Sequence, residues 1–524
     1  MITSTFSVRT SVVSAVATLG LAALAAWAAP QEARAQLVPI SGLSLNPDGG
    51  DPADPVAVTA CNGGPQTGLV YRNSETEPYI AVNPVNPDNM IAGWHQDRWS
   101  DGGGQSLGAA YSFDGGATWT QVIIPFTRCS GGAPGSAGDF ERASDPWISF
   151  GPDGRAHYMA LVFNDSVTAN GMASAFSDDG GVTWSEPVII TASPAKDPTG
   201  VSLFHDKNSF TADPFDPDLV YATWTLFRWG SWAVLFSRST DGGRSWRHAR
   251  PINNFDPVDP AVMAIFRQGS QIVVLPDGTL VNAFFRIVAN LQAGGSFLEQ
   301  SIFRSTNQGL TWEQRDTVVS DLFPAGAVDV ELGVPVRDAS QIPDIAVNGD
   351  SGDLYMTWQD SRFNPAGRVG VVVARSTDGG DSWSAPVQVN QVADPAVQAF
   401  LPSVSVNANG TVGVMFYDFR NDVGGDAVLS TDVHLARFAP DLTFQEEVRI
   451  TPESFDLRQS VITGSRGYFP GDYVGLDVDG SDFVAAFTVT NQLGLPVGFP
   501  QVIPGGLAVD ANNRQDIVFA RVTP

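Results

Sequence analysis

The stretch Ser376-Thr-Asp378-Gly-Gly380-Asp-Ser382-Trp383 decides the fold of this 524-residue chain, because it is one of five copies of one pattern. The pattern is Ser-x-Asp-x-Gly-x-(Thr/Ser)-Trp, and the other copies begin at Ser112, Ser177, Ser239 and Ser305. Successive copies start 65, 62, 66 and 71 residues apart. A near-constant period of this size predicts a repeat architecture rather than a set of separate domains.

Each copy has the composition of a tight hairpin turn. An Asp side chain accepts hydrogen bonds from backbone N–H groups a little further along the chain, and the glycines supply positive φ. The Trp adds an apolar body that can be buried beside the turn. We therefore interpret the third residue of each copy as structural rather than catalytic: Asp114, Asp179, Asp241, Asn307 and Asp378.

Each copy lies within a longer unit of four short strands, separated by Asn-Pro and Pro-Asp-Gly clusters that are typical of hairpins. The units begin near residues 78, 146, 208, 271, 343, 402 and 473. We predict an all-β fold, a seven-bladed β-propeller of four-stranded antiparallel blades with Asp-box turns. Six blades are the alternative, because the last two units lack the pattern.

The two ends of the chain have separate expected roles. Residues 1–35 have a positively charged start, an Ala/Leu/Val-rich core and a small-x-small cleavage site, so they predict a signal peptide and a secreted or periplasmic protein. Residues 36–70 are expected to close the last blade, with Asp54–Val58 as the missing strand. Residues 71–524 are expected to form a single propeller domain.

The charge of the chain limits its partners. The formal net charge is −27, and the acidic excess is spread along the chain. This distribution argues against nucleic acid and anionic membranes as partners. We expect a monomer with no membrane span after signal removal, and a carbohydrate or glycoconjugate as its ligand.

The cysteines predict a disulfide, and a short acidic turn raises the question of bound calcium. Cys61 and Cys129 are expected to form one disulfide in an oxidising compartment, with two free thiols as the alternative. Without a Cys/His cluster, we expect no metal site and no required cofactor. The turn Asp477-Val-Asp479-Gly-Ser-Asp482 resembles a fragment of a calcium loop, so calcium is the alternative there. Its position between a first and a second strand favours an ordinary hairpin.

The meander predicts which face carries the site. The Asp-containing turns join third to fourth strands, so second-to-third and blade-to-blade connections crowd the opposite face. Arginines, carboxylates, Trp and Tyr recur in those connections. A funnel lined in this way is typical of a sugar-binding site.

The repeated pattern, on blades of this length, resembles the Asp-box repeats of the bacterial sialidase (neuraminidase) superfamily. The resemblance implies a six-bladed propeller, from which seven blades would depart. It also implies an arginine triad that grips the carboxylate of sialic acid, an Asp acid/base and a Tyr that a Glu activates.

The resemblance assigns residues to these roles. Tyr71-Arg72 stands where the family has Phe/Tyr-Arg-Ile-Pro, although Asn73-Ser74 replaces Ile-Pro. Arg98 and Asp101 resemble the next arginine and the acid/base, and Tyr473 is the counterpart of the nucleophile. We expect Arg337 and Arg466 to complete the arginine set.

The implied function is that of a secreted sialidase-like glycoside hydrolase acting on glycoconjugates or polysaccharide. Arginines can bind a carboxylate bidentately, and a carboxylic acid can protonate the leaving oxygen. A polysaccharide lyase or other glycosidase is one alternative, with His95, His205 or Tyr468 as the base of a lyase. A non-catalytic carbohydrate- or protein-binding propeller is another.

Overall fold

The structure is a computed structural model. It describes residues 35–46, 61, 66, 68, 70–164, 169–228, 231–252, 262–290, 295–463, 467–490, 501–502, 508–509 and 514–524. The expected signal peptide up to residue 34, the expected strand Asp54–Val58, and Arg466 lie outside the described residues. The elements within these ranges are β-strands and two short 3-10 helices (Arg128–Ser130 and Leu457–Gln459). The described part has no helix with the length and apolarity needed to cross a membrane.

Five separate sheets carry the four-stranded antiparallel blade, and in four of them the strands follow chain order outward from the axis. The first two are β11 (Leu203–Ala212), β12 (Leu219–Arg228), β13 (Ser231–Thr240) and β14 (Arg250–Pro251), then β15 (Val262–Val274), β16 (Leu280–Asn290), β17 (Gly295–Ser305) and β18 (Thr317–Asp321). The next two are β21 (Asp344–Val347), β22 (Leu354–Asp360), β23 (Gly370–Ser376) and β24 (Val387–Gln388), then β25 (Ala399–Val406), β26 (Val412–Asp418), β27 (Ser430–Phe438) and β28 (Phe444–Arg449). In this last sheet β29 (Phe455–Asp456) also pairs with β27.

The fifth separate sheet joins the two ends of the chain. It consists of β32 (Gly475–Asp479), β33 (Asp482–Thr490), β36 (Gln515–Val522) and β1 (Val38–Pro39). Val38 pairs with Phe519 and Pro39 with Val518. The outer strand of this blade therefore comes from Val38–Pro39, upstream of the expected Asp54–Val58.

The remaining sheet is nine-stranded and holds two meanders. They are β3 (Thr76–Val82), β4 (Met90–Trp99), β5 (Gly104–Ser112) and β6 (Thr120–Ile123), followed by β7 (Arg142–Phe150), β8 (Ala156–Phe163), β9 (Ala169–Ser177) and β10 (Val188–Pro194). Strand β2 (Val70–Tyr71) adds to β4. A single pair, Gly104 with Ala143, joins the two meanders. The prediction of seven, or alternatively six, separate blades is therefore wrong, because only five sheets stand as separate blades.

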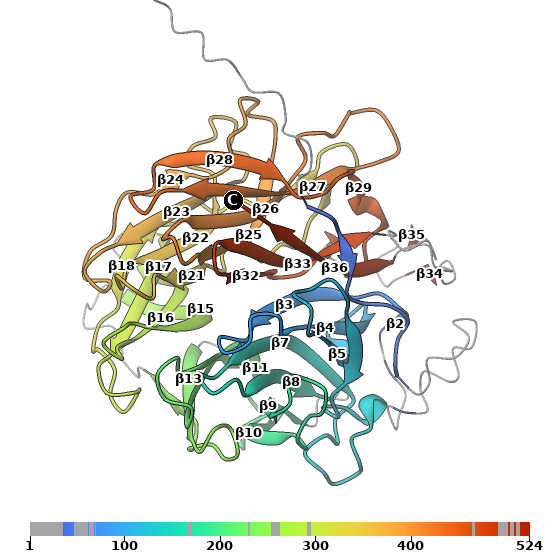
Figure 1. Ribbon diagram of the computed structural model, residues 1–524, viewed down its shortest axis with the longest axis vertical. Helices are drawn as coiled ribbons and strands as arrows, with labels where there is room; N and C mark the ends of the chain where they lie inside the picture. Colours follow the sequence, from blue (N-terminus) through green and yellow to red (C-terminus); the bar gives the residue numbers. More distant parts are fainter. Residues whose placement is uncertain are drawn as a thin grey trace, which may run out of the picture.

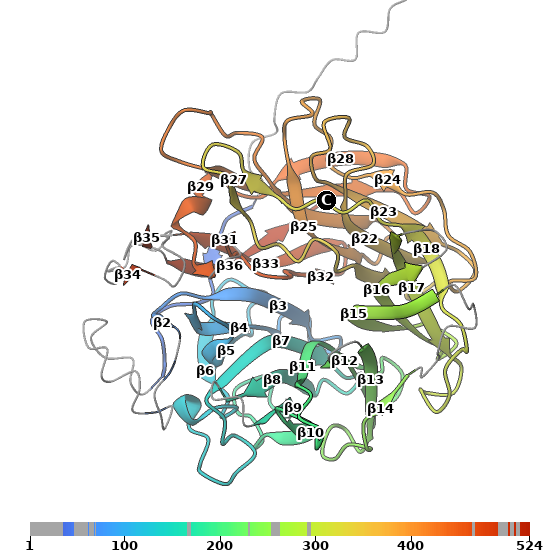
Figure 2. The ribbon, with the colours of Figure 1, turned by 180° about the vertical axis from the view of Figure 1, so that it is seen from behind.

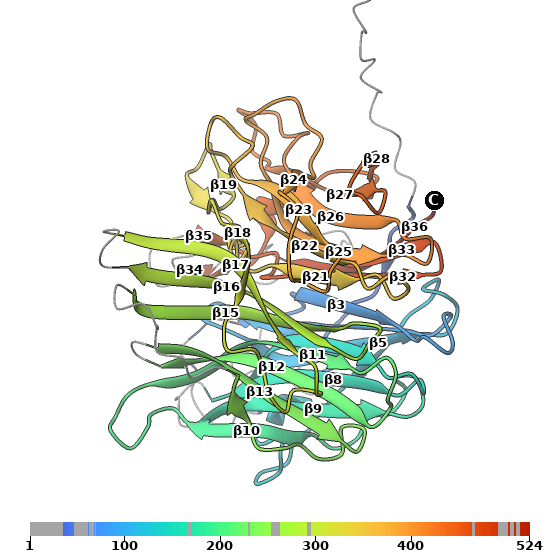
Figure 3. The same cartoon turned by 90° about the vertical axis from the view of Figure 1, so that its left-hand side faces the viewer.

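The first strand of every meander lies near the axis (Figure 1). β3, β7, β11, β15, β21, β25 and β32 contact one another in that order, and β32 contacts β3 in turn. The view from behind and the side view both place the blue β3 beside the red β32 (Figures 2 and 3). The ring is therefore closed where the two ends of the propeller meet, at β3 and β32.

The shorter β-strands and pairs outside the blades lie in the connections. They are β19 (Val328–Asp329) with β20 (Val334–Pro335), β30 (Ile462–Thr463) with β31 (Gly467–Tyr468), and β34 (Gln501–Val502) with β35 (Ala508–Val509). The β19–β20 hairpin contacts β31 through a parallel bridge between Val336 and Tyr468. This contact brings Arg337 to the top of the axis.

The hairpin turns have the hydrogen bonds that their composition predicts. In the first, Asp114 Oδ1 accepts from Ser112 Oγ and from Thr118 N, both at 2.8 Å, and Trp119 Nε1 donates to Gly116 O at 3.0 Å. Asp179, Asp241, Asn307 and Asp378 make the same bond to the backbone N–H four residues ahead. These residues close turns at the rim and have no contact with the axis.

A repeated β-bulge turns side chains into the axis. The register of β3, β7, β11, β15 and β25 shifts within the strand, each time where two residues lie opposite one residue of the neighbouring strand. The first of these two residues has positive φ in every case: Glu77 (55°), Asp145 (53°), Lys207 (54°), Gly269 (71°) and Leu401 (53°). Bulges re-aim side chains, whereas left-handed backbone at a residue other than glycine costs on the order of 1–3 kcal/mol. Three of these strained positions carry charges that face the candidate site.

Candidate active site

A polar pocket of about 510 Å³ opens on the axis. It lies among the connection from β4 to β5, the starts of β7 and β11, and the segment after β20, which is the face that the meander topology predicts. Its charged lining consists of Glu77, Arg98, Asp101, Arg142, Asp145, Asp206, Lys207 and Arg337. The pocket therefore presents both signs of charge at close range.

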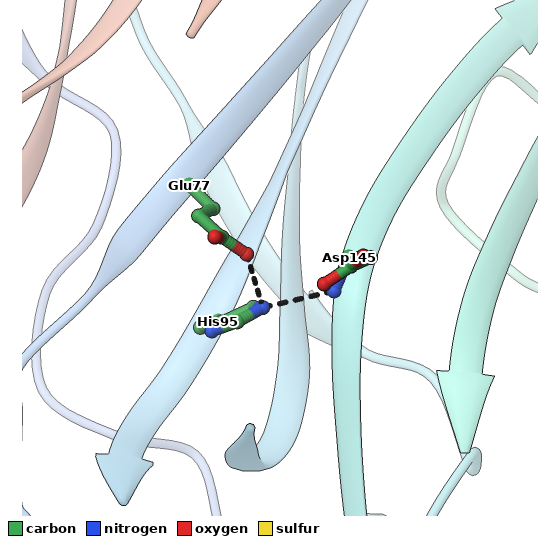
Figure 4. A group of neighbouring side chains, drawn as sticks. All are labelled: Glu77, His95 and Asp145. Carbon is green, nitrogen blue, oxygen red and sulfur yellow. Dashed lines mark hydrogen bonds and ion pairs between the residues drawn. The ribbon is translucent and has the colours of Figure 1, made fainter. Parts of the chain in front are cut away.

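Glu77, His95 and Asp145 form a hydrogen-bonded cluster at the base of this region (Figure 4). His95 Nε2 lies 2.8 Å from Glu77 Oε2 and accepts from Asp145 N at 2.9 Å. Ser144 Oγ donates to Asp145 Oδ1 at 2.7 Å. Glu77, His95 and Asp145 are all buried.

The same cluster has the composition of a metal site. One potential ligand atom from each of Glu77, His95 and Asp145 lies within 4.8 Å of the others. However, His95 Nε2 already accepts a backbone N–H, and Lys207 Nζ lies 3.9 Å from Asp145 Oδ2. Because the chain supplies its own cation and hydrogen bonds, we interpret the cluster as a hydrogen-bonded network rather than a metal site.

Asp472 links the two cations on the far side of the pocket. Arg337 donates from Nη2 to Asp472 Oδ2 at 2.7 Å and from Nε to Oδ1 at 3.2 Å, and Lys207 Nζ donates to Oδ2 as well. Asp472 N donates to Glu77 Oε1 at 3.1 Å. Burial alone would raise the pKa of Asp472, but Arg337 and Lys207 outweigh it and hold that pKa well below its usual range.

Arg98 lies opposite Arg337 without a carboxylate of its own. Both guanidinium groups stack on Phe469, with centroid distances of 4.7 Å for Arg98 and 4.3 Å for Arg337. Arg98 Nη1 donates to Gly103 O at 2.6 Å, and no carboxylate among the described residues forms an ion pair with this side chain. Burial and the neighbouring Arg337 lower the pKa of Arg98 to about 10. An anion bound in the pocket would oppose this lowering, because it would stabilise the charged form of Arg98.

Asp206 is a carboxylic acid at the pocket wall. Burial, together with Asp145 and Asp472, raises its pKa to about 7, although Lys207 opposes the shift. Its side chain is 24% exposed, and Asp206 Oδ1 and Asp145 Oδ2 each lie 3.9 Å from Lys207 Nζ. Asp206 therefore combines access to the pocket with a proton that it holds near neutral pH.

Asp101, the predicted acid/base, lines the mouth of the pocket. It accepts from Arg142 Nη1 at 2.6 Å, and Arg142 Nε donates to Gln66 at 2.9 Å. A side chain at Gly68 would come within 2.0 Å of Asp101 Oδ1, so a close approach by the N-terminal segment requires glycine there. The disulfide between Cys61 and Cys129 ties this segment to the sheet.

The other predicted site residues do not all meet. Arg98 and Arg337 share the pocket with Asp101, but the half-buried Arg72 does not line it, and its two terminal nitrogens are buried with no hydrogen-bond partner among the described residues. Tyr473 is buried, with its ring 5.6 Å from that of Trp147. The described part of the chain offers its hydroxyl no partner either, and burial, with Asp145 and Glu77, raises its pKa well above 10.

The residues suggested for a lyase lie away from the pocket lining. His205 accepts from Trp224 Nε1 at 2.8 Å, and burial lowers its pKa to about 4. Tyr468 O–H contacts Asp329 Oδ2 at 3.4 Å. Neither lines the pocket, and His95 is bound to Glu77.

The acidic turn that resembles a calcium loop is held by an arginine. Arg521 Nη1 donates to Asp479 Oδ2 at 2.7 Å and to Asp482 Oδ2 at 3.0 Å. Asp477 accepts from Val82 N at 2.8 Å. A side chain of β36 thus binds two carboxylates of the hairpin between β32 and β33.

The sequence analysis placed six of the site's charged residues on the polar face, in its blade-to-blade connections, but assigned none of them a role in the site: Glu77, Arg142, Asp145, Asp206, Lys207 and Asp472. A usable signal was the repeated charged-residue-Pro step at the start of inner strands, Glu77-Pro78 and Asp145-Pro146. Each such step marks a bulge that directs the charged side chain inward. Lys207 and Asp472 carry no such signal.

The fold and pocket define a β-propeller with a charged axial site, and the comparisons extend this description. The chain is 23% identical to a sialidase from Micromonospora viridifaciens over 219 residues, which are 36% of this chain and 32% of that protein. The match thus spans about a third of the relative's length. It confirms the resemblance to the sialidase superfamily. No protein-family model matches the chain.

The chain also matches solved structures, with TM-scores below 0.5. An α-L-arabinofuranosidase from Fusarium graminearum in complex with an iminosugar inhibitor gives a TM-score of 0.45 at 12% identity, covering 69% of this chain and 94% of the other. Trypanosoma rangeli sialidase in complex with sialic acid gives 0.39 at 14% identity, covering 77% and 55%. NanB sialidase from Streptococcus pneumoniae, as a mutant, gives 0.42 at 10% identity, covering 93% and 70%.

Proposed function

We propose that this protein is a sialidase-like glycoside hydrolase whose substrate is a sugar that carries a carboxylate. The observation that carries the proposal is Arg98. It is 2% exposed, lines the pocket, and has no ion-pair partner among the described carboxylates. A carboxylate between Arg98 and Arg337 would supply the missing charge, because arginines bind carboxylates through charge-assisted hydrogen bonds.

Asp206 is the proposed general acid. Glycoside hydrolysis needs a carboxylic acid that protonates the leaving oxygen, and such an acid works best with a pKa near the working pH. Asp206 meets this requirement through its pKa of about 7 and its place in the pocket wall. Asp101 is less suited, because Arg142 already binds its carboxylate at 2.6 Å.

Asp145 is the proposed second carboxylate. It lines the pocket and accepts from Ser144 Oγ and from Lys207 N, so its orientation is fixed. A second carboxylate either activates water or attacks the sugar carbon, depending on its distance from the acid. Tyr473 is a weaker nucleophile in this setting, because nearby carboxylates oppose its ionisation.

The test is hydrolysis of a panel of aryl glycosides and natural glycosides, including a sialoside and an α-L-arabinofuranoside. Asp206→Asn should lower kcat/KM for a glycoside with a sugar leaving group by about 10²–10⁴-fold. The loss should be smaller for an aryl glycoside, because a phenol leaves with little help from an acid. Asp381→Asn, at a side chain that is 67% exposed, is the control.

Two outcomes would change the proposal. Hydrolysis that is equal in wild type and Asp206→Asn would remove Asp206 from the acid role, and Asp101→Ala would then be tested in its place. Binding of a carboxylate sugar without hydrolysis of any glycoside would indicate a binding propeller instead.

Export is also part of the proposal. The apolar leader predicted over residues 1–35 supports a secreted or periplasmic protein. Mass spectrometry of protein purified from the native host should give a mature chain that starts at Gln36. A chain that retains the leader in the cytoplasm would contradict export.

A further inference from the structure

A second chamber of about 420 Å³ adjoins the pocket. It shares Asp206, Lys207 and Arg337 with the first chamber. The rest of its lining consists of aromatic, aliphatic and amide side chains together with Asp472: Phe227, Trp232, Gln268, Ala339, Gln341 and Ile342. Beyond the three shared residues, the first chamber has five further charged residues among those described (Glu77, Arg98, Asp101, Arg142 and Asp145), whereas the second adds Asp472 and an indole ring.

Trp232 is the main apolar surface of this second chamber. Its ring meets Phe227 edge-on at 4.9 Å and Phe266 at 5.2 Å. Two phenyl rings therefore brace the indole, while the side chain remains partly exposed to the chamber. An aromatic ring that is fixed before binding loses little conformational entropy when a ligand stacks on it.

Gln268 and Gln341 add neutral hydrogen-bonding groups beside Trp232. Gln341 Nε2 donates to Ser340 Oγ at 3.0 Å, and both glutamines line the chamber. Apolar surface with a few polar groups is what small-molecule sites generally present. Hydroxyl groups on a ring with an apolar face match this lining better than an anion does.

We propose that the second chamber is the leaving-group subsite and that it binds a neutral sugar ring stacked on Trp232. The inference rests on the proposed hydrolase function and deepens it. Asp206 lies in the wall that the two chambers share, so a glycosidic oxygen that joins a sugar in one chamber to a sugar in the other would pass beside the acid. Asp206 would donate its proton to that oxygen as the bond to the sugar carbon in the charged chamber breaks.

The test compares wild type with Trp232→Ala and Trp232→Phe. Phe297→Ala, at an exposed aromatic on the neighbouring hairpin, is the control. Two readouts are needed. The first is binding of neutral disaccharides (lactose, N-acetyllactosamine and cellobiose) by saturation-transfer NMR and calorimetry. The second is the ratio of kcat/KM for sialyllactose to kcat/KM for an aryl sialoside.

We expect wild type and Phe297→Ala to bind at least one disaccharide, with binding about tenfold weaker in Trp232→Ala and intermediate in Trp232→Phe. The ratio of kcat/KM for sialyllactose to kcat/KM for the aryl sialoside should fall about tenfold in Trp232→Ala, because the aryl leaving group depends less on contact with Trp232. Circular dichroism checks that each variant is folded, and Trp232→Phe keeps the test valid if Trp232→Ala fails to fold.

The two proposals fail in different ways. Disaccharide binding that depends on Trp232, without hydrolysis of any glycoside, would retain the subsite and remove the hydrolase function. Hydrolysis of aryl sialosides with no disaccharide binding, or with binding and a kcat/KM ratio unchanged by Trp232→Ala, would overturn the subsite and retain the hydrolase.

Discussion

Arg337 binds Asp472 through two nitrogens, at 2.7 and 3.2 Å, across 135 residues of sequence. Asp472 also binds Lys207, so one buried carboxylate holds two cations at the pocket wall. Asp472 therefore controls the charge balance of the site, because its loss would leave Arg337 and Lys207 without the carboxylate that they share.

Asp472→Asn should lower the free energy of unfolding by about 3–5 kcal/mol, since breaking a buried ion pair leaves uncompensated charge. Urea unfolding followed by fluorescence measures the change. Asp381→Asn removes an exposed partner of Arg304 and should change stability by about 1 kcal/mol or less. Equal effects of the two variants would contradict the role assigned to Asp472.

Arg98→Met should separate stability from binding. The substitution removes a buried charge without a carboxylate partner, so we expect stability to rise by about 1 kcal/mol while affinity for a carboxylate sugar is lost. Thermal unfolding and calorimetry with N-acetylneuraminic acid measure the two effects. Arg244→Met, at an exposed arginine, is the control, and unchanged sugar binding in Arg98→Met would exclude Arg98 as the anion site.

The activity should depend on the protonation of Asp206. Burial raises its pKa to about 7, and only the protonated form can donate. We therefore expect kcat/KM to fall as pH rises through about 7, with an apparent value that belongs to the coupled carboxylates of the pocket. In Asp206→Asn this alkaline decline should disappear from the residual activity; if the decline persists unchanged, another group is the acid.

His157 should make the fold sensitive to acid. Burial, aided by Arg155, lowers its pKa from 6.5 to about 3. Because the fold keeps this histidine neutral, its contribution is constant above pH 6.5 and is lost as pH falls toward 3. The loss should reach about 2 kcal/mol at pH 5. His157→Phe should show a shallower decline than wild type in urea unfolding at pH 7, 6 and 5, whereas the exposed His248→Phe should follow wild type.

The disulfide should stabilise the propeller by restricting its unfolded state. Cys61 and Cys129 are 68 residues apart, and closing a loop of this length is worth about 4 kcal/mol in the chain-entropy model. Reduction, or Cys61→Ser with Cys129→Ser, should lower the Tm accordingly. The bridge also anchors the segment that carries Gln66, so a change in KM on reduction should disappear in Gln66→Ala.

Local sequence was enough to predict the repeat, the strands and the turns. The hydrogen bonds of Asp114 and its equivalents join residues four positions apart, so both partners lie in the same hairpin. Alternation of the connections likewise predicted the polar face. The number of separate sheets was not predictable, because a single pair between Gly104 and Ala143 merges two meanders.

The membership of the site was decided by tertiary structure. Lys207 and Asp472 are 265 residues apart, and no local pattern predicts their contact. Arg72 and Tyr473 fit a family motif by position, yet neither side chain lines the pocket. A repeat fixes its turns through neighbours in sequence, whereas ring closure and inward bulges determine which charges meet at the axis.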